Sequence, residues 1–280
     1  MQLLKSMMIL LVCSCLVTAC TTLRHSQRIE IDNGQIAYAS LGEGPLTIVL
    51  EAGLGDGMGS WDGIFEELSS ITKVFAYSRP GYLPSSATKR PRTPEQIVDD
   101  LRLILNRSGN HPPYLLVGHS LGGLYMLNFI ERYPEEVAGV VLIDSRHPMM
   151  TQACLEKNLS SCKLPKALYV LLPSHVRHEY DGAQEPKLPS TMGDTPLVVV
   201  SRAPSQGKES DALQTLWVEM QIGLSELSDR SQHLIAEHAG HYVHKQEPER
   251  VIEGINWVIS EWHSGQAKAK TEISVFSNAD

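Results

Sequence analysis

A serine flanked by glycines stands where a buried strand is expected to turn directly into a helix. Residues 118–122 read Gly-His-Ser-Leu-Gly, after the apolar run 114–117 and before the expected helix 124–133. A tight strand-to-helix turn holds the serine hydroxyl exposed in a strained backbone conformation, and the glycines remove side chains that would clash there. The spacing therefore predicts Ser120 as a nucleophile for acyl transfer.

A serine hydroxyl needs a general base to lose its proton near neutral pH. Of the eleven histidines, His241 lies between the last expected strand and the last expected helix. A loop at that position reaches the carboxyl edge of the sheet, where Ser120 also lies. His238 and His244 are close alternatives, and His119 is part of the turn itself. We predict His241 as the base.

A carboxylate should orient the imidazole and stabilise its charged form. Asp144 ends the apolar run 137–143, directly after the expected helix that follows Ser120. The commoner place is one strand later, after 196–200, where the nearest carboxylates are Glu209 and Asp211. We favour Asp144 and keep Asp211 as the alternative acid. The other interpretation of Asp144 is a carboxylate that binds loop amides at a strand end.

An oxyanion hole needs two N–H donors that converge where the carbonyl oxygen gains charge. The turn itself supplies the amide of Leu121. The second donor should come from the loop 51–55, where glycines let the backbone approach a substrate closely. We assign it to Leu54.

Apolar strands alternate with helical patterns along most of the chain, which predicts a mostly parallel sheet flanked by helices. An Asn-Gly turn at residues 33–34 predicts an N-terminal hairpin, and Thr93 is expected to cap a helix that begins at Pro94. The further expected strands are 46–50, 74–77, 114–117, 137–143 and 196–200, and the last expected helix is 248–262. Residues 147–194 break the alternation and are predicted to be a cap insertion.

The chain resembles the α/β-hydrolase superfamily over residues 29–262, and four segments carry the resemblance. They are residues 51–55, 78–82, 118–122 and 240–242. Two features depart from the common pattern: residues 52–53 read Ala-Gly where His-Gly is usual, and no acid closely follows the strand 196–200. Some members carry their acid at the position of Asp144. The resemblance implies hydrolysis of an ester-like bond in a small molecule, through an acyl-enzyme on Ser120 and without metal or organic cofactor.

Two other functions stay open. A proline-type aminopeptidase or amidase would use the same residues and need an acidic anchor for the substrate amine, for which Glu179 and Asp181 are candidates. A binding lipoprotein without catalytic activity would need no strained serine turn. Among the remaining histidines, His175 and His178 lack the further ligands of a metal site.

The first residues predict export. Lys5 precedes a short apolar run, and residues 17–20, Val-Thr-Ala-Cys, resemble the lipobox of bacterial lipoproteins. We therefore expect a signal peptide at 1–19, a lipid on Cys20, a linker at 20–27, the hydrolase domain at 28–263 and a flexible tail at 264–280. The lipid would hold the protein in the bacterial envelope, on the periplasmic side of the outer membrane where one exists. A simply cleaved signal is the alternative.

The net charge bears on the class of binding partner, and the cysteine content bears on a possible disulfide. The net charge is -8 with no basic stripe, which excludes a nucleic-acid partner on electrostatic grounds. After the signal and Cys20, two of the five cysteines remain, Cys154 and Cys162. In an oxidising compartment this pair predicts a disulfide.

Overall fold

A computed structural model describes residues 22–32, 34–88, 92–159, 164–183, 189, 191–204 and 211–277. The predicted signal peptide 1–19 and the predicted lipidation site Cys20 lie outside these ranges and stay predictions. Among the described residues, no helix has the length and apolar composition needed to cross a bilayer.

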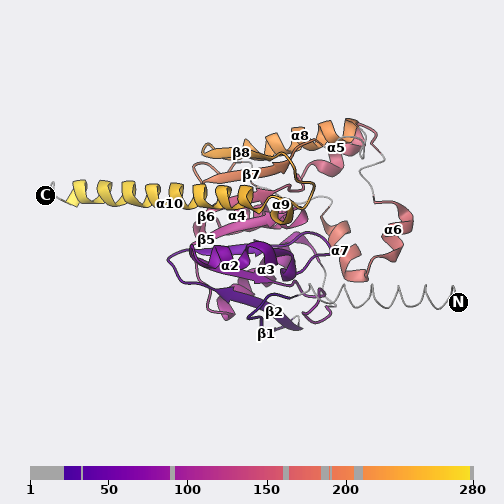
Figure 1. Ribbon diagram of the computed structural model, residues 1–280, viewed down its shortest axis with the longest axis horizontal. Coiled ribbons are helices and arrows are strands. Elements are labelled where there is room, and N and C mark those ends of the chain that lie inside the picture. The colour runs from indigo at the N-terminus through magenta and orange to yellow at the C-terminus, as the bar shows by residue number, and fades with distance from the viewer. Residues whose placement is uncertain are drawn as a thin grey trace.

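One eight-stranded sheet runs through the centre of the molecule, in the order β1-β2-β4-β3-β5-β6-β7-β8 (Figure 1). Its strands are β1 (Gln27–Ile31), β2 (Gly34–Leu41), β3 (Thr47–Glu51), β4 (Lys73–Tyr77), β5 (Tyr114–His119), β6 (Val137–Ile143), β7 (Leu197–Arg202) and β8 (Ser231–Ala236). β1 and β2 pair antiparallel as the predicted hairpin, and β2 is antiparallel to β4. All neighbours from β4 to β8 are parallel. The predicted α/β class is confirmed.

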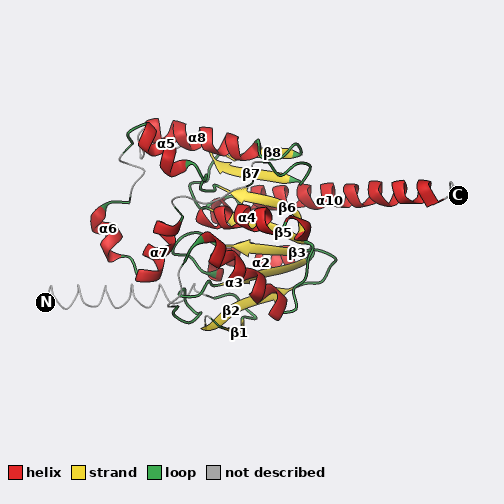
Figure 2. Ribbon diagram, turned by 180° about the vertical axis from the view of Figure 1, so that it is seen from behind, coloured by secondary structure: helices red, strands yellow, loops and turns green. Residues whose placement is uncertain are grey.

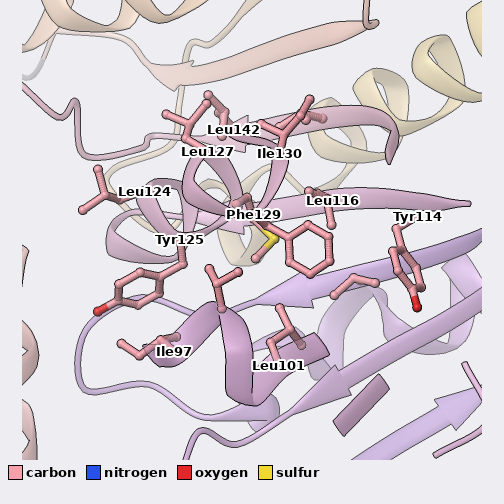
Figure 3. Packing of buried hydrophobic residues seen from close by; sticks show 14 of the residues in the cluster. Ile97, Leu101, Tyr114, Leu116, Leu124, Tyr125, Leu127, Phe129, Ile130 and Leu142 are labelled. Atoms are coloured by element: carbon pink, nitrogen blue, oxygen red, sulfur yellow. The ribbon is translucent and has the colours of Figure 1, made fainter. Parts of the chain in front are cut away.

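Helices cover both faces of the sheet because the central strands are apolar on both sides. They are α2 (Asp62–Ser69), α3 (Pro94–Arg107), α4 (Leu121–Arg132), α8 (Asp211–Ser225), α9 (Val243–Gln246) and α10 (Pro248–Ser277), with short 3-10 turns η2 (Met58–Trp61) and η3 (Pro134–Glu136). Leu116 of β5 packs in one cluster with α3 and α4 (Figure 3). Its neighbours Leu115 and Val117 point to the other face and pack with α2 and α10. This alternation follows from the two-residue period of a strand.

The cap insertion contains three short helices: α5 (Met150–Glu156), α6 (Lys166–Leu171) and α7 (Ser174–Gly182). In Figure 2 the arrowheads of the strands point toward the side on which α6 and α7 lie. The cap helices therefore stand at the carboxyl end of the parallel strands, which is where ligands bind in sheets of this class.

Two elements in the C-terminal part of the chain differ from the expectations. The last helix was expected to end at Trp262, but α10 continues to Ser277, so residues 264–277 are helical where a flexible tail was expected. In Figure 1 this end of α10 extends beyond the sheet. The strand β8 was not expected, because it is an edge strand whose residues are largely exposed or half-buried and so has no continuous apolar run.

A buried carboxylate ties the cap to the core. Glu179 of α7 is fully buried and accepts hydrogen bonds from Arg79 Nε at 3.3 Å, Arg92 Nε at 3.0 Å and Tyr82 Oη at 2.9 Å. Burial alone would raise the pKa of Glu179, but the two guanidinium groups hold that pKa below its ordinary value. Arg79 also pairs with Glu51 at the end of β3, so the network connects α7 to the centre of the sheet.

Glu179→Gln is expected to lower the free energy of unfolding by about 3–5 kcal/mol at pH 7, because it leaves Arg92 and Arg79 buried with one carboxylate fewer. The pKa of Glu179 is lower in the folded than in the unfolded protein. The stabilisation that its carboxylate gives to the fold is therefore fully present above the unfolded pKa, and it is lost as the pH falls through the folded pKa. Urea unfolding at pH 7 and at acidic pH measures both effects. The exposed Asp181→Asn should change stability by less than about 0.5 kcal/mol; equal losses in both variants would contradict the assignment.

Candidate active site

Ser120 occupies a strained turn between β5 and α4. Its backbone angles are φ 53° and ψ -119°, in a region that residues with a side chain rarely adopt. A Cβ on Gly118 would come within 2.5 Å of Gly123 Cα, and one on Gly122 would overlap the carbonyl oxygen of Glu51. The two glycines of the sequence motif are therefore required by close packing around the turn.

The side chain of His241 contacts the Ser120 hydroxyl. His241 Nε2 lies 2.9 Å from Ser120 Oγ, and His241 stands in the loop between β8 and α9. Its carbonyl oxygen accepts a hydrogen bond from His119 Nε2 at 2.8 Å, so the neighbour of the serine also fixes the backbone of the histidine. His238 is exposed on the same loop, whereas His244 is buried.

Asp144 contacts the other nitrogen of His241. Asp144 Oδ2 lies 2.7 Å from His241 Nδ1, and the residue is fully buried at the end of β6. Asp144 Oδ1 accepts hydrogen bonds from Trp217 Nε1 at 2.8 Å and from the Arg202 amide at 3.3 Å. With Nδ1 donating to this carboxylate, Nε2 is free to accept the serine proton.

The alternative acid, Asp211, is the first residue of α8, and its side chain lies outside the described residues. The same helix instead contributes Trp217, which sequence reasoning missed. A single tryptophan in a helix of weak amphipathic pattern gave no signal that its indole N–H would hold a carboxylate.

The two residues assigned as oxyanion donors lie on the wall of the same cavity as the serine. Leu54 and Leu121 both line the cavity that contains Ser120 and His241. In the described part of the chain, neither backbone amide donates a hydrogen bond to another residue. Both N–H groups are thus available to a ligand.

The cavity has a volume of about 470 Å³, which lies in the range of small-molecule sites. Its wall comes from the serine turn, the cap and α8. The lining residues are Leu54, Ser120, Leu121, Arg146, Met150, Leu164, Tyr180, Ala183, Arg202, Leu213, Trp217 and His241. Over the described residues the wall is mostly apolar, and besides the His241 imidazole it presents two guanidinium groups, of Arg146 and Arg202.

Two further histidines pack behind the site and stay neutral. Burial, followed by the nearby His241, lowers the pKa of His119 to about 3. Burial, followed by His119, lowers the pKa of His244 to about 2. His244 Nε2 lies 3.0 Å from Ser60 Oγ, and its ring packs at a tilt against Trp61, with 4.5 Å between the ring centroids.

His244→Gln is expected to change the pH dependence of folding. In the unfolded chain a histidine titrates near pH 6.5, whereas folded His244 stays neutral well below that pH. Below pH 6.5 the unfolded wild type therefore binds one proton more than the folded protein at this residue. The free energy of unfolding of the wild type consequently decreases as the pH is lowered. Glutamine keeps a polar group near Ser60 but does not titrate. Between pH 6 and pH 5 the stability of the wild type relative to the variant should fall by about 1 kcal/mol. Urea unfolding at several pH values tests this; parallel curves would refute it.

The structure tests the predicted disulfide only in part, and it also bears on whether a metal site is present. Among the described residues, no group of three or more His, Cys, Asp or Glu side chains is arranged to hold a metal ion. Cys154 is buried in α5, whereas Cys162 lies outside the described residues. The Cys154–Cys162 disulfide stays a prediction.

The family model described as alpha/beta hydrolase fold matches residues 47–161, a range that contains Ser120 and Asp144. Together with the order and direction of the strands, this match identifies the fold. The chain has the α/β-hydrolase fold. The resemblance expected from residues 29–262 is thereby confirmed at the level of the fold.

The individual relatives of this chain are distant. "Uncharacterized protein YqjL" of Bacillus subtilis (strain 168) is 24% identical over 218 residues, which are 74% of this chain and 81% of the relative. "Proline iminopeptidase PfmaB" of Pestalotiopsis fici is 30% identical over 165 residues, 56% of this chain and 58% of the relative, less than two thirds of its length. A thermophilic esterase from Thermogutta terrifontis superposes with a TM-score of 0.62 at 18% identity, covering 85% of this chain and 99% of the esterase. At that identity the likeness is one of fold.

Proposed function

We propose that this α/β-hydrolase cleaves an ester-like bond through an acyl-enzyme on Ser120. The observation that supports the proposal most strongly is the hydrogen-bonded chain from Ser120 Oγ through His241 to Asp144, with links of 2.9 Å and 2.7 Å. A strained serine in contact with a histidine, itself oriented by a buried carboxylate, is the arrangement that nucleophilic acyl transfer requires.

The steps follow from this geometry. Ser120 Oγ attacks the substrate carbonyl carbon while its proton passes to His241 Nε2, and Asp144 stabilises the imidazolium. The carbonyl oxygen becomes an oxyanion that the Leu54 and Leu121 amides stabilise. The carbon–oxygen bond to the alcohol breaks as His241 returns the proton to it. Water, deprotonated by His241, then attacks the acyl-enzyme and releases the carboxylic acid and free Ser120.

An ester fits the cavity better than the amine-bearing substrate of an aminopeptidase. The two candidate amine anchors serve elsewhere: Glu179 is fully buried against Arg79 and Arg92, and Asp181 bonds Tyr169 on the exposed side of the cap. Neither lines the cavity, and the described part of the cavity wall contains no carboxylate. A positively charged amine would therefore meet guanidinium groups and no counterion.

A fluorophosphonate probe tests the proposal, because it phosphonylates only activated serines. We expect intact-mass spectrometry to show one adduct on the wild type and none on Ser120→Ala. Ser70→Ala removes an exposed hydroxyl at the end of α2 and should label normally. A wild type that stays unlabelled would favour the binding protein without catalytic activity.

We also propose that a lipid on Cys20 anchors the enzyme to the bacterial envelope. The short apolar run and the Val-Thr-Ala-Cys sequence at 17–20 support this proposal. In cells fed labelled palmitate, the wild type should incorporate label and Cys20→Ser should not; label in both would contradict the anchor.

A further inference from the structure

The charged groups on the cavity wall are unbalanced. Arg146 and Arg202 both line the cavity, and none of the lining residues that the structure describes carries a carboxylate. Arg202 has a partner, because its Nη1 lies 3.8 Å from Asp144 Oδ2 and its guanidinium lies over the Trp217 ring at 5.2 Å. The excess positive charge therefore belongs to Arg146.

Arg146 has unused hydrogen-bonding capacity inside the protein. Its Nη2 donates to Thr151 Oγ1 at 2.7 Å, but its Nε is buried and has no partner among the described residues. No carboxylate pairs with it in that part of the chain, whereas buried Arg79 and Arg92 both do. A buried charge without a counterion is costly, so such groups are normally paired. Burial lowers the pKa of Arg146, yet a guanidinium stays charged at neutral pH.

The position of Arg146 is fixed relative to the nucleophile. Its backbone N–H donates to the carbonyl oxygen of Ser120 at 3.0 Å. Arg146 also follows Asp144 by two residues, in the segment that carries the acid. The backbone of Arg146 is therefore anchored to the turn that holds the reacting serine, while Thr151 Oγ1 accepts a hydrogen bond from its guanidinium. Any group that the guanidinium binds thus takes a defined place in the cavity.

Resting on the proposed esterase function, we infer that Arg146 binds a carboxylate of the substrate, so that the preferred substrates are esters which carry a free carboxylate. A guanidinium presents parallel N–H donors that match the two oxygens of a carboxylate. The apolar residues around it, among them Leu213, Met150 and Leu164, would surround the hydrocarbon chain between the carboxylate and the ester. Half-esters of aliphatic dicarboxylic acids have this chemistry.

The test compares charged and neutral substrates of one shape. Monoethyl succinate, adipate and suberate are each paired with the ester in which a neutral amide replaces the carboxylate, and kcat/KM is measured by acid release at constant pH. We expect the wild type to prefer the carboxylate ester by about tenfold or more at one chain length at least. Arg146→Gln should lower that ratio by about 10- to 100-fold. Arg250→Gln, an exposed arginine on α10, should leave the ratio unchanged.

The outcomes separate this inference from the function on which it rests. Where turnover is too slow to measure, the concentrations of the two esters that halve fluorophosphonate labelling compare their binding, and the same preference for the carboxylate ester is expected there. Labelling of Ser120 without a preference for carboxylate esters, or a preference that survives Arg146→Gln, overturns the inference alone. No labelling of the wild type overturns the esterase proposal and the inference with it.

Discussion

Ser120→Ala, His241→Ala and the double variant are each expected to lower kcat on an ester by nearly the same factor, roughly 10⁵–10⁶. The reason is that the hydroxyl and the imidazole act as one unit: without the base the serine is a poor nucleophile, and without the serine the base has no proton to take. The 2.9 Å contact between them is the basis of this expectation. The remaining rate would come from the oxyanion donors and from substrate binding.

Steady-state hydrolysis of a p-nitrophenyl ester measures these effects. His238→Ala is the matched control, because His238 lies three residues from His241 on the same loop but is exposed; it should change kcat by less than about threefold. If the double variant were slower than either single variant by a further large factor, the two residues would be acting independently. That result would rule out the acyl-enzyme mechanism.

Most of the sheet and the serine turn were predictable because their determinants are local. Continuous apolar runs indicate strands that are buried on both faces. The Thr93 side chain accepts a hydrogen bond from the Gln96 backbone amide, as the capping pattern predicts. The glycines around Ser120 are needed by contacts within a few residues and with the adjacent strand. His241 was found by topology, since a loop that follows the last strand has to pass the same edge of the sheet.

The parts that were not predicted depend on long-range contacts or on exposed elements. α8 has a weak amphipathic pattern, and its Trp217 reaches Asp144 across 73 positions of the sequence. Glu179 meets Arg79 across 100 positions, so nothing in the local sequence distinguishes this carboxylate from a solvated one. For the same reason, the sequence alone could not show that Glu179 is unsuited to anchor a substrate amine.

Asp144→Asn is expected to lower kcat by about 10⁴-fold while leaving the fold intact. Asp144 Oδ1 accepts hydrogen bonds from Trp217 Nε1 and the Arg202 amide. These two donors would hold the oxygen of an asparagine at the same place, and the NH₂ group would then face His241 Nδ1. An amide N–H there requires Nδ1 to accept, so the ring proton moves to Nε2. The imidazole could then no longer take the proton of Ser120.

Asp211→Asn is the matched comparison, because it makes the same chemical change in the alternative acid at the start of α8. It should change kcat by less than about threefold. In urea unfolding, the free energy of unfolding of both variants should lie within about 1 kcal/mol of the wild-type value. A fully active Asp144→Asn together with an impaired Asp211→Asn would transfer the acid to α8. The contact of Asp144 with His241 would then serve only to fix the loop that carries His241. In that case the Asp144 carboxylate would not decide which imidazole nitrogen carries the proton during catalysis.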